Sequence, residues 1–485
     1  MNNSSVVEIL KSFSKDEFRK FEDFSGSPYY NKNAKVIRLV TYLKSAVHHT
    51  EEEALRKEVV WRNLFGDKKF NYGVMKNIIY DLRKITDQFM SAEILMKREP
   101  ENRLACLHFL TNKGLTHQLE KSIKAMRSEL SKMEISDDYF KCNYMLEMID
   151  KGNMEIFLKT GNRNFGDYSS FNRHFLSYFF INFFMANNKG LLVSAMYDKD
   201  NLNADLIKVL KFFEKDYRDN DILSMLYYYS LRLNLEDKNE ELYFEVKKFI
   251  IEHYDSFDRR TRYNSCVHLL RFCSKLTLND DTRFAEETFG IIKFMISKNV
   301  YNSDVNRFID HSFYYMAVDI AVHFKDSAWC RFFIDTYKEK LNPVLRKNYE
   351  NLSMMLLCRT EQNFSLSLEY LSKVIPDSSL VKLTIKEYEL KNYYELGYYE
   401  EIYSLIKNNK NFSVNDRTFS KQVLNSFNNL MKYLKKLLDF KLSPKKGKYN
   451  LYGLEKLLSE IQDKSIFNKS WLMNILNQTI NDISV

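Results

Sequence analysis

The sequence predicts an all-α protein built largely of stacked helical hairpins. Gly and Pro are scarce, with 12 and 5 among 485 residues, whereas folds rich in strands use both residues in their many tight turns. Hydrophobic residues make up 45% of the chain, which is enough for a large buried core. Apolar residues also recur with helical spacing along most of the sequence. A chain of this length is expected to form several domains or a repeat array.

The N-terminal segment is predicted to open with a well-defined helix. Ser14 and Glu17 have the spacing of a capping box, in which each side chain accepts a hydrogen bond from the backbone N–H of the other residue. Pro28 disfavours helical geometry at Ser27, so we expect this helix to end there. Three phenylalanines form the apolar stripe of the helix: Phe18, Phe21 and Phe24.

Two further helices complete this module, which we predict to span residues 1–98. One has an apolar face made of Val36, Ile37, Val40 and Leu43. The other begins near Asn71 and has an apolar face made of Met75, Ile78, Ile79, Leu82, Ile85 and Phe89. The segment 98–102 contains Pro100 and is the predicted domain boundary.

Residues 99–485 are predicted to form an array of helix pairs. A polar turn at Lys113-Gly114 separates one pair, and a polar link at 236–240 separates another. In the second pair, one helix has an apolar face of Leu223, Leu226, Tyr227 and Leu231, and the next has Leu242, Val246, Phe249 and Ile250. The number of repeats between Leu104 and Lys340 does not follow from these patterns.

The clearest internal repeat lies between Tyr349 and Asn409. Tyr399 stands 35 residues after Phe364, and Ile406 stands 35 residues after Leu371. A weaker copy lies 37 residues earlier and places Cys330 where Ser367 stands. A small residue at that position is expected to let the paired helix approach closely.

This region resembles degenerate tetratricopeptide repeats, which have a period of about 34 residues and a small residue shortly after an aromatic one. Gly397, Tyr399, Ser367 and Cys330 match that pattern, whereas Ile402 stands where a small residue is expected. The whole chain also resembles a group of large helical bacterial proteins of unknown function. Segments 27–33 and 469–472 carry this second resemblance. The first resemblance implies an α–α superhelix, a solenoid of stacked hairpins that follows the N-terminal module.

No pattern of residues predicts catalysis, a cofactor or a metal. Gly161 and Gly166 have the glycine spacing of a phosphate-binding loop, but the Lys that contacts phosphate is missing. Asp319 and His323 stand one helical turn apart, with no second such pair nearby to complete a metal site. The trio Cys266, His268 and Cys273 also lacks zinc-binding spacing. We therefore predict that the protein is not an enzyme and has no catalytic, cofactor-binding or metal-binding residues.

One basic segment is a candidate binding patch. Between residues 432 and 448 a single acid, Asp439, stands among these lysines: Lys432, Lys435, Lys436, Lys441, Lys445, Lys446 and Lys448. Clustered lysines favour a phosphate backbone or an acidic partner. A solvated helix face followed by a basic linker is the alternative interpretation.

The expected location is the cytoplasm. The six cysteines are scattered, and the N-terminus lacks the basic and apolar regions of a secretory signal. The most apolar stretch, residues 175–186, is too short to span a bilayer. No membrane association is therefore predicted.

The predicted function is that of a non-catalytic scaffold for protein–protein interaction. Stacked helix pairs present an extended surface that generally binds peptides or helices of a protein partner. The alternative is a nucleic-acid-associated or regulatory protein that uses the N-terminal module or the basic segment 432–448. Steep weakening of nucleic-acid binding by salt would favour that alternative.

Overall fold

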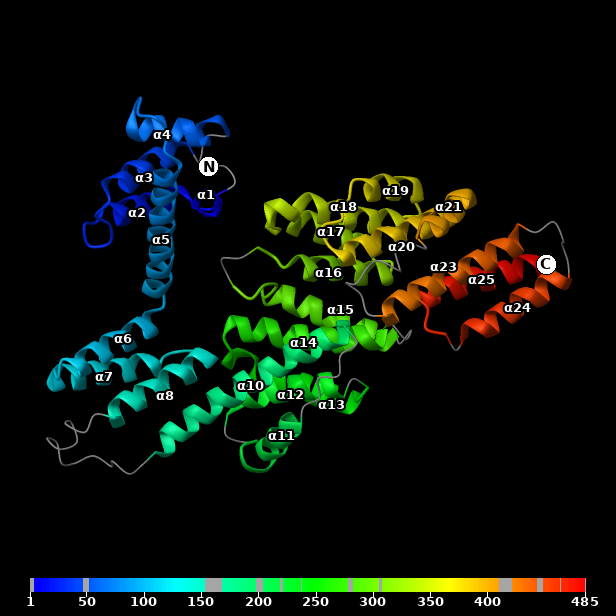
Figure 1. Cartoon of the computed structure of the whole chain (residues 1–485). Coiled ribbons are helices and arrows are strands. Elements are labelled where there is room, and N and C mark those ends of the chain that lie inside the picture. The colour runs from blue at the N-terminus through cyan, green and yellow to red at the C-terminus, as the bar shows by residue number, and fades with distance from the viewer. Residues whose placement is uncertain are drawn as a thin grey trace. The chain divides into compact units, whose positions relative to one another are not determined.

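The prediction of an all-α fold is confirmed. The computed structural model covers the whole chain, and the residues that it describes are 4–46, 52–152, 168–197, 204–218, 221–236, 238–277, 282–304, 308–409, 421–442, 448–462 and 464–484. Among these residues there are 23 α-helices and no β-strand (Figure 1). The chain divides into two compact units, each taken by itself below. Unit 1 comprises Met1–Lys132 and Met145–Gly166, and unit 2 comprises Met133–Tyr144 and Asp167–Val485.

Unit 1 is organised around one long helix, α5. The unit contains α1 (Ser5–Lys11), α2 (Lys15–Gly26), α3 (Ala34–Ala46), a short 3-10 turn (Glu52–Leu55), α4 (Lys57–Phe65), α5 (Tyr72–Lys97), α6 (Glu99–Asn112) and α7 (Thr116–Leu130). Helices α1, α2 and α3 all pack on α5, as Figure 1 shows. The N-terminal hydrophobic core lies entirely between Val6 and Phe89, so its apolar contacts end before residue 98.

The predicted capping box is present at the start of α2. The backbone N–H of Ser14 donates to Glu17 Oε2 at 2.8 Å, and the backbone N–H of Glu17 donates to Ser14 Oγ at 3.2 Å. These hydrogen bonds hold the pKa of the Glu17 carboxyl below its usual value. At the other end, Ser27 has the extended ψ angle of 123° that a residue before proline prefers. Both local predictions about this helix are therefore confirmed.

The predicted break at residues 98–102 is wrong in its extent. Arg98 alone separates α5 from α6, and Pro100 lies in the first turn of α6. Proline fits there because the first turn needs no intrahelical N–H donor. The N-terminal core ends at Phe89, within α5, and unit 1 as a whole continues through α6 and α7.

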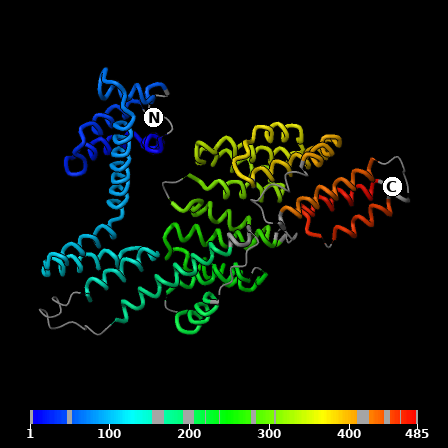
Figure 2. Tube along the Cα trace, viewed as in Figure 1, coloured from blue at the N-terminus to red at the C-terminus, as the bar shows by residue number. Residues whose placement is uncertain are grey.

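Unit 2 is a succession of antiparallel helices (Figure 2). It includes the first part of α8 (Asp137–Gly152), up to Tyr144, while the rest of that helix belongs to unit 1. The unit continues with α10 (Ser169–Tyr197), α11 (Ala204–Asp216), α12 (Ile222–Leu235), α13 (Glu240–His253), α14 (Arg259–Thr277), α15 (Thr282–Ser297), α16 (His311–His323), α17 (Ser327–Tyr337), α18 (Pro343–Thr360), α19 (Phe364–Ser372), α20 (Ser379–Leu396), α21 (Tyr399–Asn409), α23 (Lys421–Lys441), α24 (Lys448–Gln462) and α25 (Lys469–Ser484). Consecutive helices pack as pairs, including α12 with α13, α14 with α15, and α18 with α19. None of the described helices is long and apolar enough to cross a membrane.

The turns of three successive hairpins follow the predicted repeat. Lys325, Gln362 and Gly397 precede the second helix of each hairpin and have φ angles of 55°, 59° and 74°. These left-handed residues are separated by the same 37 and 35 residues that the sequence comparison indicated. The second helices begin at corresponding positions, Ser327, Phe364 and Tyr399.

The small residue of the repeat has the expected place between paired helices. Ser367 Oγ donates to the carbonyl of Met355 at 3.0 Å, and Cys330 Sγ donates to the carbonyl of Val318 at 3.6 Å. Both contacts span 12 residues and join the second helix of a hairpin to the first. Ile402 occupies the corresponding position of the third hairpin and is fully buried.

Helix α20 belongs to two hydrophobic cores of unit 2. Val381 lies in the larger core, which extends from Phe140 through the stacked hairpins. Leu383, Leu390 and Tyr394 lie in a C-terminal core formed with α21, α23, α24 and α25. The stacked hairpins and the C-terminal helices are thus joined through one helix.

Candidate binding surfaces

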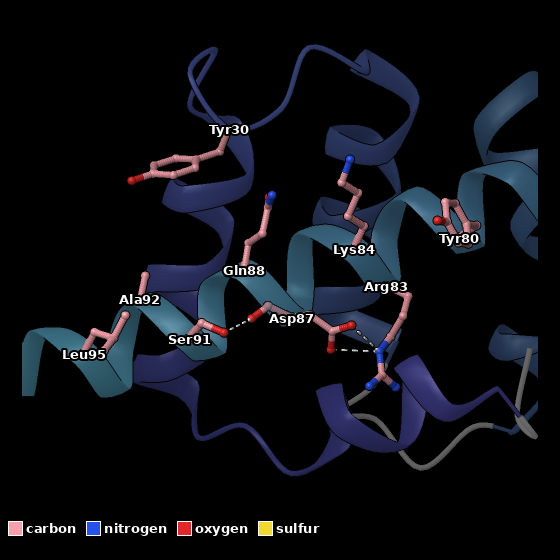
Figure 3. A pocket seen from close by; sticks show the side chains of 9 residues that line it. All are labelled: Tyr30, Tyr80, Arg83, Lys84, Asp87, Gln88, Ser91, Ala92 and Leu95. Carbon is pink, nitrogen blue, oxygen red and sulfur yellow. Dashed lines mark hydrogen bonds and ion pairs between the residues drawn. The ribbon is translucent and has the colours of Figure 1, made fainter.

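A groove of about 570 Å³ lies along one face of α5 in unit 1. Figure 3 shows the residues that line it: Tyr30, Tyr80, Arg83, Lys84, Asp87, Gln88, Ser91, Ala92 and Leu95. Tyr80 and Leu95 are large apolar side chains with 71% and 55% of their surface exposed. The groove therefore presents aromatic and aliphatic surface to solvent along most of one helix.

The wall of this groove is held in place by local packing. The Tyr30 ring stacks on Phe24, with centroids 4.1 Å apart, and the Tyr30 N–H donates to the Ser27 carbonyl at 3.1 Å. The break that Pro28 imposes between α2 and α3 thus places Tyr30 beside α5. The groove is preformed on that side and needs no large rearrangement to accept a ligand.

Of the charged residues in the groove, only some are paired with an opposite charge. Arg83 pairs with Asp87 through a contact of 2.9 Å, so their charges largely offset each other. Lys84 points away from that pair in Figure 3 and has no ion pair among the described residues. The groove consequently carries one uncompensated positive charge between its two tyrosines.

A second cluster joins α18, α20 and the C-terminal helices inside unit 2. Lys391 is buried, and its ammonium contacts Glu387 at 2.6 Å and Asn468 Oδ1 at 3.0 Å. The same ammonium lies over the Tyr388 ring, 4.8 Å from its centroid. Nearby, Arg359 donates to the side chain of Asn392, and burial holds the pKa of this guanidinium below its usual value.

Asp319 of α16 lies at the edge of this cluster. Its side chain is exposed to solvent. Loss of hydration, together with the nearby Glu387 carboxylate, raises the pKa of Asp319 to about 6, although Lys391 opposes the shift.

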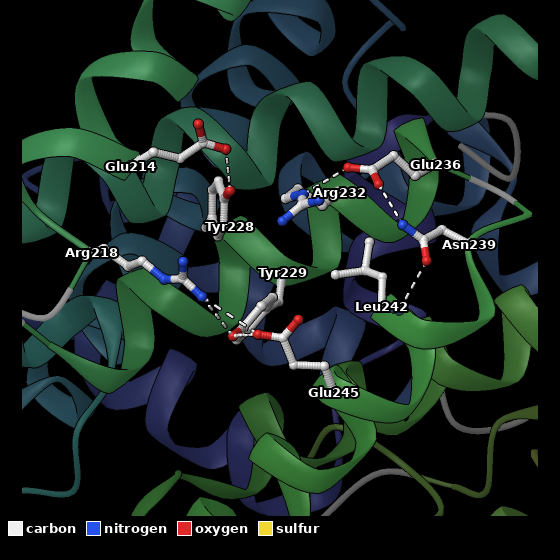
Figure 4. A network of polar contacts seen from close by, with 9 residues as sticks. All are labelled: Glu214, Arg218, Tyr228, Tyr229, Arg232, Glu236, Asn239, Leu242 and Glu245. Atoms are coloured by element: carbon white, nitrogen blue, oxygen red, sulfur yellow. Dashed lines mark hydrogen bonds and ion pairs between the residues drawn. The ribbon is translucent and has the colours of Figure 1, made fainter.

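Figure 4 shows a network of polar contacts that connects α11, α12 and α13. Tyr228 donates to Glu214, and Tyr229 donates to Glu245 at 2.5 Å. Burial raises the pKa of both phenols, so they remain protonated donors at neutral pH. Arg232 completes the network by pairing with Glu236 at 2.7 Å. Each of these groups has a partner within the fold, so the network is best explained as structural.

The described lysines of the predicted basic patch lie on two sides of α23: Lys432, Lys435 and Lys436 are three and four residues apart and share one face, with Lys432 and Lys436 both over the Tyr433 ring, whereas Lys441 lies on another. Lys432 and Lys435 are exposed on α23. Lys436 pairs with Glu460 of α24 at 2.8 Å, whereas Lys441 contacts the Tyr394 hydroxyl of α20 at 3.2 Å. Lys445 and Lys446 lie outside the described residues, as does the side chain of Lys448.

The other residues considered from sequence are also dispersed. Gly161 and Gly166 lie outside the described residues. Burial lowers the pKa of His268 to about 3 and raises the pKa of Cys266 to about 12. Among the described residues, no group of three or more His, Cys, Asp or Glu side chains could hold a metal ion.

The α5 groove could not be predicted from the sequence. Tyr80, Lys84 and Leu95 occupy solvent-side positions of an amphipathic helix, where single apolar residues are common. The neighbouring motif at 27–33 was a partial signal, because it supplies Tyr30. The groove itself depends on how α2, α3 and α5 pack together.

Comparison of the chain with family models, curated proteins and solved structures found no match in any of the three. The resemblance to tetratricopeptide repeats therefore stays a prediction from the hairpin pattern. What the structure defines is a class of architecture: an all-α protein with stacked hairpins and an exposed groove on a separate unit.

Proposed function

We propose that this protein is a non-catalytic scaffold that binds another protein through the α5 groove. The observation that carries the proposal is the exposed aromatic and aliphatic lining of that groove, with Tyr80 71% and Leu95 55% exposed. Apolar side chains gathered in an exposed groove are typical of protein-binding sites. In this proposal the hairpins of unit 2 form a tetratricopeptide-like superhelix that supplies further contact surface.

The dimensions of the groove suit a helical or extended peptide segment. Tyr80 and Leu95 are 15 residues apart on α5, which corresponds to about 22 Å along a helix. A partner segment of about four helical turns would cover this distance. The uncompensated Lys84 favours an acidic side chain near the middle of that segment.

The buried titratable groups support a non-catalytic role. The pKa of the Cys266 thiol is raised to about 12 and the pKa of the His268 imidazole is lowered to about 3. Groups that exchange protons during catalysis usually have pKa values near the working pH. Both shifts instead keep these groups neutral, as packing in a core requires.

Affinity capture from the native host with mass spectrometry tests the proposal. The full-length protein is compared with the double variant Tyr80→Ala/Leu95→Ala and with Tyr452→Ala. Tyr452 is a matched control because it is also 71% exposed but lies on α24. We expect one or more proteins that the wild type and the control recover equally and that the double variant recovers at least tenfold less.

Two results would contradict the proposal. The first is equal recovery of every specific partner by the double variant and the control. The second is recovery of nucleic acid in place of protein, with binding that weakens steeply between low and high salt. That second result would favour a nucleic-acid-associated function.

A further inference from the structure

A cavity of about 300 Å³ lies between α17, α18 and α19 in unit 2. Two helix faces enclose it, one on α17 and one on α18, and Tyr370 of α19 lines a third side. On both faces the lining side chains recur every three or four residues, the spacing of neighbours on a helix. The volume is at the lower end of the range for small-molecule sites, about 300–1,000 Å³. The α17–α18 cavity is therefore sized for a small ligand.

The middle of this cavity is apolar. Ile334 of α17 and Leu357 of α18 are buried, and Met354 of α18 is half-buried. At one end of the cavity Arg331 pairs with Glu361 at 2.5 Å, so these two charges offset each other. The middle can thus accept an apolar group, and burial of that group would contribute to affinity.

At the opposite end, one ammonium group faces two carboxylates. Lys338 Nζ lies 3.5 Å from Asp335 Oδ1 and 3.7 Å from Glu350 Oε1. Both distances exceed the length of a strong charged hydrogen bond, about 2.7–2.9 Å. Because a single lysine is shared by two acids, one negative charge at this end is not neutralised.

Lys347 brings an opposite charge to the same end. It precedes Glu350 by one helical turn on α18, so the two side chains lie on one face. The Lys347 side chain is exposed, and within the part of the chain that the structure describes it forms no hydrogen bond or ion pair. One end of the cavity consequently has both a surplus carboxylate and an unpaired ammonium, next to apolar surface.

We propose that the α17–α18 cavity binds a free α-amino acid with an apolar side chain. The ligand ammonium lies between Asp335 and Glu350, the ligand carboxylate pairs with Lys347, and the side chain occupies the apolar middle. An α-amino acid carries both charges on one carbon atom, with its side chain directed away from them. A simple amine or a fatty acid supplies only one of the charges, and a peptide separates the two. This site lies in unit 2 and goes beyond the proposed scaffold function.

Equilibrium dialysis of the full-length protein against radiolabelled L-leucine and L-phenylalanine tests the site. We expect one of these amino acids to bind saturably, one per chain, with a dissociation constant below about 1 mM. Three competitors, each lacking one feature of L-leucine, dissect the recognition. Leucinamide lacks the carboxylate, N-acetyl-L-leucine lacks the ammonium, and glycine lacks the apolar side chain. We expect each competitor to bind at least tenfold more weakly than L-leucine.

Two variants assign the charges of the ligand to particular side chains. Lys347→Gln should weaken binding of L-leucine at least tenfold without weakening leucinamide, which has no carboxylate to lose its partner. Asp335→Asn should weaken L-leucine to a similar extent without weakening N-acetyl-L-leucine, which has no ammonium. Both side chains are exposed, so both variants should fold normally, as circular dichroism would report. Lys382→Gln, at an exposed position of α20 outside the cavity, should bind L-leucine as the wild type does.

Any of three results would disprove this site. The first is the absence of saturable binding of both labelled amino acids. The second is binding of any of the three competitors as tight as that of L-leucine. The third is unaltered binding of L-leucine in either Lys347→Gln or Asp335→Asn. None of these measurements involves α5, so failure here leaves the proposed protein-binding groove intact, and failure of the capture experiment leaves this site untouched.

Discussion

The hairpins α18–α19 and α20–α21 both turn through a left-handed residue but differ in the contacts between their helices. In the first, Ser367 is fully buried, donates to the Met355 carbonyl and accepts from the Asn392 side chain at 3.0 Å. In the second, Ile402 stands at the equivalent position, also fully buried, within the C-terminal core. One position of the repeat is thus polar and small in one hairpin, and apolar and large in the next.

The residue at this position also contacts a different neighbour in each hairpin. Asn392 belongs to α20, so Ser367 links its own hairpin to the following one through a specific hydrogen bond. Ile402 packs in the core that α21 shares with α23, where apolar volume stabilises the contact. Ser367 therefore connects two stacked hairpins, whereas Ile402 lies where the stack meets the C-terminal helices α23, α24 and α25.

The largest effect is expected from Ser367→Leu. The added volume must displace α18 or α19, and the Asn392 amide loses its acceptor, so we expect a loss of about 4 kcal/mol in stability. Native-state hydrogen exchange of α18 and α19 amides measures this loss. Ser372→Leu on the same helix is exposed and should change stability by less than about 0.5 kcal/mol. If the α18 and α19 amides were equally protected from exchange in both variants, the buried Ser367 would not be needed for the packing of this hairpin.

A smaller loss is expected when the large residue of the other hairpin is truncated. Ile402→Ala leaves a cavity in the C-terminal core and should cost about 3 kcal/mol, measured by hydrogen exchange in α21 and α23. Ile375→Ala is the matched control, because its side chain is 71% exposed. If Ile402→Ala instead tightened α21 against α20 without loss of protection, Ile402 would be a spacer and not a core residue.

Single substitutions in the turns of the two hairpins should change the stability of unit 2 in opposite directions. Gly397→Ala places a side chain at φ 74° with no nearby atom to clash with it, so only backbone strain remains and the cost is about 1 kcal/mol. Gln362→Gly relieves the same strain at φ 59° and should stabilise by about 0.5 kcal/mol. Urea unfolding of unit 2 measures both. A loss of stability in Gln362→Gly would show that the Gln362 side chain contributes more than its strained backbone costs.

The smallest effect is expected from Asp319→Asn, as a function of pH. The pKa of this carboxyl is raised from a normal value of 3.8 to about 6 in the folded protein, so the folded state binds more protons than the unfolded state between these values. Stability of the wild type therefore falls as pH rises from about 4 to 6. The variant should lack this decline and be more stable at pH 7 by about 0.5 kcal/mol, because solvent screens an accessible carboxylate.

Thermal unfolding in parallel buffers from pH 4 to 7 measures that difference. A variant whose profile matches the wild type would show that Asp319 is fully hydrated.

Much of the helical architecture could be predicted from the sequence because its signals are local. The capping box at Ser14, the break at Pro28 and the offset between Phe364 and Tyr399 all depend on residues close together in the chain. The predicted break at 98–102 is only one residue long in the structure, at Arg98. Pro100 taken alone predicts the end of a helix. The structure shows instead that α5 ends at Lys97 and that Pro100 lies in the first turn of α6.

The candidate sites could not be predicted because they depend on distant contacts. Tyr30 and Tyr80 are separated in the chain by α3 and α4 and line one groove only because α2 and α3 pack on α5. The basic segment 432–448 was visible in the sequence for the opposite reason, since its lysines are neighbours in the chain. On α23, Lys432 and Lys435 are exposed, whereas Lys436 and Lys441 contact partners on α24 and α20.

The sharing of α20 between two cores also affects how unit 2 comes apart. In an array of hairpins each layer depends on its neighbours, so unfolding spreads along the array from an end. Val381 and Leu390 place α20 in both cores, so loss of the C-terminal helices exposes the side chains of α20 that pack in the C-terminal core. The C-terminal core therefore acts as the capping layer of the stack, and a chain cut between α21 and α23 would fray from α20 toward α16.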